Sequence, residues 1–309
     1  MSAMSDPQRR DNVAAREGLT VARRSQWQLF LARFVRHRVA MVSLFVLAAI
    51  VGVALGAEYV TSYAYDGMNL RAANRAPTLQ GNHFFGTDKL GRDYFTRVVY
   101  GTRTTIFVAL VVALVSTFVG TFLGAVAGYF GGIVDNILMR LTDLIIILPG
   151  LALLMIMAEF LGEGSPLQVA IILSSLLWTL IARIVRAQFM SLRRREFIEA
   201  AILAGASPWR VIWRHMLPNA IGPIIVNATL TISTAILIES ALSFIGFGVK
   251  PPTPALGQLV SQGRGSMQTQ WWLVTFPGLA IIAICLTINF IGDGLRDALD
   301  ARQAQKGSA

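Results

Sequence analysis

Six apolar stretches divide the chain, and each is close to the length that crosses a lipid bilayer. They cover residues 39–60, 104–129, 138–160, 167–187, 219–245 and 273–292. A helix needs about 20 apolar residues to cross roughly 30 Å of hydrocarbon. Because lipid offers no hydrogen-bonding partner to an open backbone, we expect all six to be helical. The pattern therefore predicts an all-α integral membrane protein with six transmembrane helices.

The composition agrees with this pattern and excludes other classes of protein. Of the 309 residues, 54% are hydrophobic and 14% are charged, which is too few charges to cover a water-soluble surface. The same apolar content excludes a disordered chain. The single cysteine, Cys285, excludes an internal disulfide and a cysteine-based zinc or iron–sulfur site. The three histidines are scattered along the chain, so we expect no metal site.

The basic residues predict the orientation of the helices. With the N-terminus in the cytoplasm, 19 of the 27 Lys and Arg residues fall on the cytoplasmic side. This bias follows the positive-inside rule and places both termini in the cytoplasm. The segment 61–103 runs against it, because it holds six of the eight basic residues that fall outside. The net charge of +10 thus indicates membrane topology and not nucleic-acid binding.

The segments between the apolar stretches are too short to hold a core of their own. The first stretch follows a region far too long for a cleaved signal peptide, so we expect an uncleaved anchor. The predicted parts are a basic cytoplasmic tail with an amphipathic helix (1–38), a first transmembrane anchor (39–60), an extracytoplasmic segment (61–103), a core of five transmembrane helices (104–293) with a cytoplasmic loop (193–218) and an outer loop (246–272), and a cytoplasmic tail (294–309).

The cytoplasmic loop 193–218 has a pattern of its own. A helical stretch that begins near Glu196 ends at Gly205, a residue that readily adopts a positive φ. Ser207 is a good N-cap and Pro208 suits a first helical turn, which predicts a second short helix before the next span. A simple connector needs about two to eight residues. The loop is therefore either a surface that another protein packs against or a helix pair that merely links two spans.

These residues resemble the EAA loop of bacterial ATP-binding-cassette (ABC) import permeases. The resemblance rests on Glu199, Ala200, Ala201, Gly205, Leu217 and Pro218. The general family pattern has an apolar residue two positions before Leu-Pro, where this chain has His215. The peptide-importer branch is similar to this chain there, because its pattern is His-x-Leu-Pro-Asn.

Other stretches resemble the C-type subunit of the same branch, the dipeptide and oligopeptide permeases. They are Phe85–Asp93, Glu239–Gly248, Pro251–Pro254 and Gly292–Asp297. With the EAA loop they cover the chain from about residue 80 to residue 300, in the family's order. The resemblance implies the type I importer permease fold.

The resemblance also implies a function and a set of partners. The chain would form a substrate pathway with a second, B-type permease in the bacterial inner membrane, and an extracytoplasmic binding protein would deliver the substrate. Two cytoplasmic ATPases would bind the loop as a coupling helix. The residues implied at that interface are Glu199, Ala200, Ala201, Gly205, Ala206, Ser207, Leu217 and Pro218. The sequence has no GxxxxGK[ST] motif, so ATP and Mg²⁺ would lie in the partner subunits and the chain is not expected to be an enzyme.

The substrate implied by the resemblance is a di- or oligopeptide. Nickel chelates, glutathione and sugars remain alternatives, because such a pathway passes what the binding protein presents. Two other classes are an ATP-independent carrier and an intramembrane enzyme. The sequence has no HExxH motif and no interrupted inverted helices, which argues against both.

A few polar residues interrupt the apolar stretches. Glu239 lies deep in the fifth stretch, with Ser243 nearby and Asn227 farther along. Intramembrane polar residues usually face a cavity or a partner, so a position in the pathway or gate and a structural hydrogen bond are both open. Arg140 and Asp143 lie three residues apart, which predicts a structural ion pair, with a pathway role as the alternative.

Two further patterns predict packing. Gly120, Gly124 and Gly128 recur every four residues, a spacing that lets helices approach closely. The charges of Phe85–Asp93 predict a folded outer loop that these charges hold together, with docking of a binding protein as the alternative.

Overall fold

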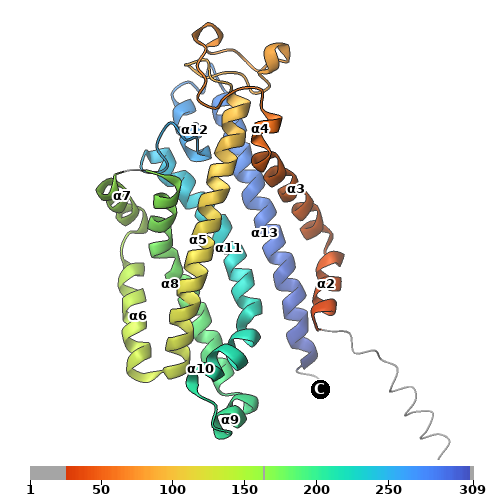
Figure 1. Ribbon diagram of the computed structural model, residues 1–309, viewed down its shortest axis with the longest axis vertical. Helices are drawn as coiled ribbons and strands as arrows, with labels where there is room; N and C mark the ends of the chain where they lie inside the picture. Colours follow the sequence, from red (N-terminus) through yellow and green to blue (C-terminus); the bar gives the residue numbers. More distant parts are fainter. Residues whose placement is uncertain (1–25, 163, 307–309) are drawn as a thin grey trace, which may run out of the picture.

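The computed structural model describes residues 26–162 and 164–306. The regular secondary structure in this part of the chain is helical, and one isolated bridge joins Thr87 and Asp93. Its long helices run side by side, with residues 61–93 at the upper end and α9 at the lower end (Figure 1). The α-helices are α2 (Gln26–Arg36), α3 (Arg38–Leu55), α4 (Ala57–Val60), α5 (Tyr94–Phe130), α6 (Gly132–Ile147), α7 (Gly150–Leu161), α8 (Pro166–Arg193), α9 (Glu196–Leu203), α10 (Pro208–Arg210), α11 (Leu217–Ile245), α12 (Leu256–Arg264) and α13 (Trp272–Lys306). Short helical turns lie at Leu70–Ala72 (η1), Gln80–Asn82 (η2) and Val211–Met216 (η3).

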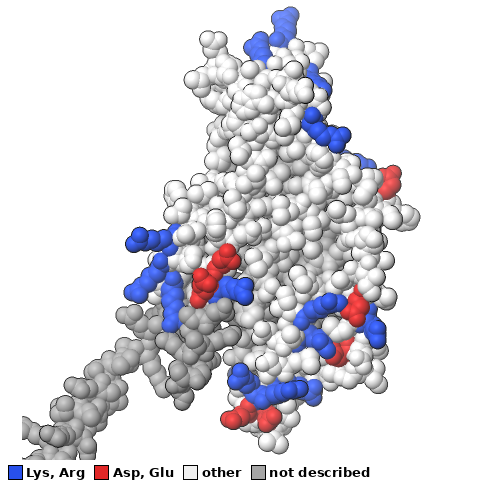
Figure 2. Space-filling view, turned by 180° about the vertical axis from the view of Figure 1, so that it is seen from behind, with Lys and Arg blue, Asp and Glu red and all other residues white. Residues whose placement is uncertain are grey.

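Five helices in the described residues are long and apolar enough to cross a membrane: α3, α5, α8, α13 and the continuous helix Pro208–Ile245 that contains α11. They confirm the all-α class. The charged side chains lie toward the two ends and leave an uncharged band between them on the face drawn in Figure 2.

The predicted third stretch, 138–160, is not one straight helix. It is divided between α6 and α7, whose axes are bent by 88°. The break falls at Pro149, and Leu148 before it is extended (φ −68°, ψ 139°), as a residue before proline prefers. The third predicted span is therefore a bent pair of helices, and the number of spans reaches six if this pair counts as one.

The glycines of α5 lie where this helix meets α8. A Cβ atom built on Gly120 would lie 2.6 Å from the carbonyl oxygen of Trp178, and one on Gly128 would lie 2.6 Å from Cβ of Phe189. At Gly124 it would overlap the backbone of α8. The predicted close approach is confirmed, and it seats α5 on α8, the span with the largest buried share.

Gly124→Leu is expected to destabilise the protein by about 3 kcal/mol or more, because overpacking costs about 1–3 kcal/mol and here part of the obstacle is backbone. The matched control is Gly52→Leu on α3, where an added Cβ meets nothing within 4 Å. Thermal unfolding in mild detergent measures both. The packing account predicts a lower melting temperature for the Gly124 variant alone, and equal melting temperatures would contradict it.

The two ends of the described chain meet at the stretch Gly292–Asp297. A Cβ on Gly294 would lie 2.5 Å from Cβ of Ala40, so glycine lets α13 pack on the start of α3. At this junction Nδ1 of His37 accepts a hydrogen bond from the Ala40 N–H at 3.1 Å, and Nε2 of His37 lies 3.5 Å from Asp297. Buried Phe34 brings α2 onto the same place. The stretch Gly292–Asp297 therefore serves the packing of α13 against α2 and α3.

Candidate functional site

The helix–glycine–helix element, residues 196–216, forms the lower end of the molecule (Figure 1). Its first helix, α9, ends in a Schellman turn: the Ala206 N–H bonds to the Ala201 carbonyl at 3.1 Å and the Gly205 N–H bonds to the Ile202 carbonyl at 2.9 Å. Gly205 has φ +82°, and an added Cβ would meet nothing within 4 Å. The position thus needs glycine for its backbone conformation and not for lack of space.

The second helix of the element continues into the membrane, contrary to the prediction of a separate short helix. Pro208 starts a single helix that runs to Ile245, and residues 211–216 of it (η3) form wider π-type turns. The widening falls before Pro218, which has no N–H and whose ring would clash with the carbonyl of Arg214 in an α-helix. Instead the Leu217 N–H bonds to the carbonyl of Ile212. The element is therefore rigidly joined to α11.

One face of the element is anchored in a core shared with α5 and α8. Its buried side chains are Ile198, Val211, Ile212 and Met216, and they pack in one cluster with residues such as Val185 and Phe189. These anchors were not predicted, although the period of apolar residues from Ile198 to Met216 could have indicated them. The anchors make the element a fixed part of the fold and not a loose connector.

The other face of the element is open to solvent. Of the predicted interface residues, Glu199, Ala200, Gly205, Ser207 and Pro218 are exposed, and Ala201, Ala206 and Leu217 are half-buried. Apolar Phe197, Ile202 and Leu203 are exposed beside them, with Leu203 at 88%. The small and apolar side chains form a surface on which another protein can pack closely.

Glu199 is the charged member of the predicted interface residues. Within the described residues, the Glu199 carboxylate makes no hydrogen bond or ion pair, and α9 has no side-chain cap. Ser207 is at the predicted N-cap position, but its hydroxyl makes no capping hydrogen bond. The Glu199 carboxylate is therefore available to a basic group on a partner.

The candidate gate residue Glu239 lies in the protein core. It is 0% exposed, and its two carboxylate oxygens accept hydrogen bonds from Ser243 Oγ at 2.6 Å and Thr105 Oγ1 at 3.3 Å. Thr105 also accepts the Leu256 N–H at 3.3 Å, so the cluster joins α5, α11 and α12. The contact with Thr105 was not predicted, because Thr105 lies 134 residues from Glu239 in the sequence. The contacts favour the structural role over the pathway role.

The side chain of Asn227, the third candidate for the pathway, hydrogen-bonds within its own helix, α11. Its side-chain amide donates to the Pro223 carbonyl at 2.8 Å, and Thr231 Oγ1 donates to the Asn227 carbonyl at 2.8 Å. Pro223 lies inside α11, where its missing N–H weakens the backbone ladder. The side-chain bonds support the helix at this place.

Glu239→Gln is expected to keep most of the folded protein and of the transport activity, whereas Glu239→Leu loses both. Gln keeps an oxygen and adds an amide donor for the two hydroxyls, but Leu leaves buried hydroxyls unpaired, at about 1–3 kcal/mol each. The measurements are melting temperature and initial uptake rate. A Gln variant that folds like the wild type but does not transport would contradict the structural role.

The predicted ion pair between Arg140 and Asp143 is wrong. Asp143 on α6 pairs with Arg183 on α8, and Asp135 on α6 binds Arg186 on α8 with both of its oxygens. The sequence suggested the neighbour three residues away, while the true partner is 40 residues away. Two ion pairs therefore hold α6 against α8, and neither includes Arg140.

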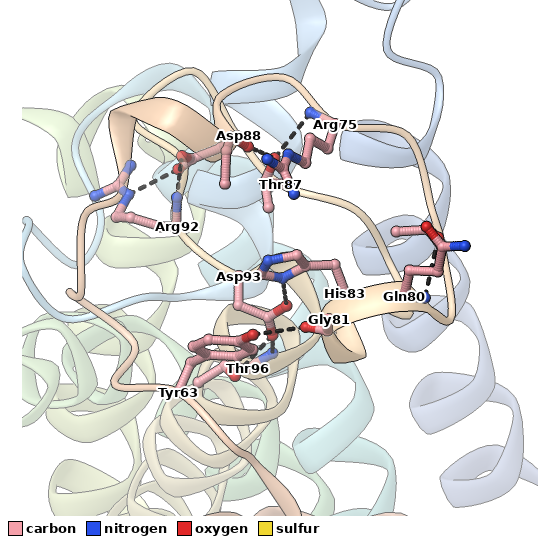
Figure 3. A network of polar contacts seen from close by, with 12 residues as sticks. Tyr63, Arg75, Gln80, Gly81, His83, Thr87, Asp88, Arg92, Asp93 and Thr96 are labelled. Atoms are coloured by element: carbon pink, nitrogen blue, oxygen red, sulfur yellow. Dashed lines mark hydrogen bonds and ion pairs between the residues drawn. The ribbon is translucent and has the colours of Figure 1, made fainter.

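The stretch Phe85–Asp93 is folded around Asp88 (Figure 3). One carboxylate oxygen of Asp88 accepts the N–H groups of Leu90 and Arg92 at 2.9 and 3.0 Å, which closes the turn. The other oxygen accepts Arg92 Nε at 2.7 Å and a guanidinium nitrogen of Arg97 at 2.8 Å. Arg97 is only 2% exposed and also reaches Gln262 at 3.1 Å. The predicted loop held by its own charges is confirmed.

Asp93 at the end of this stretch starts α5. Its carboxylate caps the helix by accepting the N–H and hydroxyl of Thr96, both at 2.8 Å, and it lies 2.8 Å from Nδ1 of His83. His83 stacks on the ring of Tyr63 (Figure 3). The segment before α5 is thereby fixed on the end of the helix.

Within the described part of the chain, no three His, Cys, Asp or Glu residues lie together as metal ligands would.

Known proteins resemble this chain over nearly its whole length. A family model described as binding-protein-dependent transport system inner membrane component matches residues 120–305, and one described as the N-terminal TM domain of oligopeptide transport permease C matches residues 25–77. The oligopeptide transport system permease protein OppC of Escherichia coli K12 is 41% identical over 286 residues, 93% of this chain and 94% of that protein. The dipeptide transport system permease protein DppC of Alkalihalophilus pseudofirmus is 38% identical over 279 residues, 90% of each protein.

Among solved structures, a chain of the MetNI methionine ABC transporter in inward-facing conformations is 22% identical, with a TM-score of 0.47, and the match covers 62% of this chain and 94% of that chain. From the two family models and the two permeases, the chain belongs to the family of binding-protein-dependent transport system inner membrane components, and within it to the OppC/DppC-like permeases.

Proposed function

We propose that the chain is the C-type permease subunit of an ATP-driven peptide importer in the bacterial inner membrane. The observation that carries the proposal is the helix–glycine–helix element, which is anchored on one face and presents small and apolar side chains on the other. A permease of this family needs such a surface, because the chain has no nucleotide-binding motif and must receive its energy from another subunit. The peptide substrate is carried over from the relatives named above.

The proposed orientation places the element in the cytoplasm and the segment 61–93 outside. The excess of basic residues on the side of the element supports it. The two features lie at opposite ends of the molecule (Figure 1), so one end would meet ATPases and the other a binding protein. A second permease of the B type would complete the pathway, and ATP and Mg²⁺ would be held by the ATPases.

The proposed coupling follows from the way the element is attached. Helix α8 leads into α9, and Pro208 begins the helix that becomes α11. When two ATPases close on ATP and move the element, both flanking spans must move with it. The Schellman turn at Gly205 fixes the angle between the two arms, so that a push on α9 reaches α11 instead of being absorbed in a flexible loop.

The proposal is tested by uptake into proteoliposomes that contain the assembled transporter and its binding protein. The expected result is ATP-dependent uptake of a labelled peptide, which unlabelled di- or oligopeptides compete away and nickel chelates, glutathione and sugars do not. Competition by one of the latter three would overturn the substrate class. Uptake that continues without ATP would overturn the importer itself and favour an independent carrier.

A further inference from the structure

The end of the molecule opposite α9 carries an excess of positive charge on its surface. We define the cap as residues 61–93 with α12 and the loop 265–271 that follows it. Its exposed basic side chains are Arg71, Arg75, Lys89 and Arg264, whereas Asp66 is its one exposed carboxylate within the described residues. In Figure 2 the uppermost part of the molecule shows Lys and Arg, and no Asp or Glu is visible there.

The other carboxylates of the cap do not reduce this charge at the surface. Asp88 is buried and used by Arg92 and Arg97, and buried Asp93 caps α5 and contacts His83. By contrast, no ion pair of Arg71, Arg75, Lys89 or Arg264 is found in the described part of the chain. The fold thus buries two of the cap's three carboxylates and leaves four of its five Lys and Arg side chains exposed.

The cationic side chains are held on a rigid frame. The Asn74 N–H donates to the Asp88 carbonyl at 3.0 Å, and the Thr87 N–H donates to the Arg75 carbonyl at 3.0 Å. These bonds tie the loop of Arg71 and Arg75 to the turn that carries Lys89. A partner would meet preorganised charges, which lowers the cost of ordering them on binding.

The same surface also exposes large apolar side chains. Met68, Leu70 and Leu79 are 65%, 72% and 81% exposed, and Leu70 is next to Arg71. Apolar contact area with charges around it is the composition of a protein interface. A protein partner therefore fits this surface better than lipid head groups, which offer charge without apolar area at that level.

The positive-inside rule does not explain why these basic residues lie at this end of the molecule. Extracytoplasmic segments of bacterial membrane proteins carry few basic residues, yet 61–103 holds six. We propose that the cap is a cationic docking surface for an acidic face of the extracytoplasmic binding protein, with Arg71 and Lys89 as residues that set the speed and selectivity of docking. This inference rests on the proposed function, and it adds the chemistry by which the partner is recognised.

The test measures association of the binding protein with the complete transporter in nanodiscs of neutral phosphatidylcholine. Charge steering raises association rates by about 10- to 1,000-fold and weakens as salt is added. The wild type should therefore associate more slowly at high than at low salt. Arg71→Glu with Lys89→Glu should lower the low-salt rate by about tenfold or more and remove most of the salt dependence.

The control is Arg140→Glu, a charge reversal of the same kind at one exposed position on α6, outside the cap. It should leave association unchanged, and all variants should keep the wild-type melting temperature and basal ATP hydrolysis. Equal low-salt association rates for the wild type and the Arg71/Lys89 variant would overturn the inference. The proposed function would not be affected, because ATP-dependent uptake tests it separately. The inference would also be overturned if the transporter in nanodiscs bound vesicles that contain phosphatidylglycerol through the cap, while the charge reversals left association of the binding protein unchanged. That result would assign the surface to lipid.

Discussion

A transporter that carries Gly205→Trp is expected to lose ATP-driven uptake while the chain still inserts and folds. The residue has φ +82°, so any side chain adds strain of about 1–3 kcal/mol, but the space around it is open and nothing inside the chain is displaced. The indole would instead project from the exposed face of the helix–glycine–helix element, where the partner must pack closely. The measurements are membrane abundance, melting temperature and uptake rate.

Two variants separate bulk from strain. Gly132 is also exposed, has φ +53° and has nothing within 4 Å of an added Cβ, but it is the first residue of α6 and lies outside the helix–glycine–helix element. Gly132→Trp should therefore transport at nearly the wild-type rate. Gly205→Ala carries the strain without the bulk and should retain part of the activity. Normal uptake by the Gly205→Trp transporter would show that the element does not couple transport to ATP.

Asp88→Asn is expected to lower the free energy of unfolding by about 3–5 kcal/mol, the usual effect of breaking a buried ion pair from one side. Asn keeps the oxygen that closes the turn but turns an amide donor toward two guanidinium groups. Arg97, 2% exposed, would then be a buried cation without a counter-charge. Thermal unfolding in detergent measures the loss.

The control for this prediction is Asp66→Asn, which removes an exposed carboxylate from the same segment and should change stability little. Replacing Arg97 by Met in the Asp88→Asn background should recover part of the loss, because the unpaired charge is then gone. If the single and double variants unfold at the same temperature, the damage comes from the turn and not from the charge pair.

Local patterns in the sequence predicted local features of the fold. The four-residue spacing of Gly120, Gly124 and Gly128 predicted close helix packing, and Gly205 predicted the turn that ends α9. Both depend on residues within one or two helical turns. Features that depend on distant residues were missed, because no local signal distinguishes an exposed charge from a buried one.

Three particular errors show this limit. Asp143 was paired with its neighbour Arg140, but the fold brings Arg183 closer. Pro218 was read as the start of a new helix, whereas π-type turns carry one helix through it. The burial of Arg97 beside Asp88 was not predicted, because it depends on α12, which is distant in the sequence and which the fold places next to Arg97.

Whether the helix–glycine–helix element binds an ATPase is tested most directly by cross-linking from Ala200. The one native cysteine, Cys285, is buried, so a Cys285→Ser background gives a clean chain in which Ala200→Cys is exposed. A short bifunctional thiol–amine reagent on native membranes, followed by mass spectrometry, identifies the partner, and Met68→Cys in the cap is the control. The account predicts an ATPase adduct from position 200 and none from position 68. Position 200 without an ATPase adduct, in membranes where uptake is intact, would contradict it.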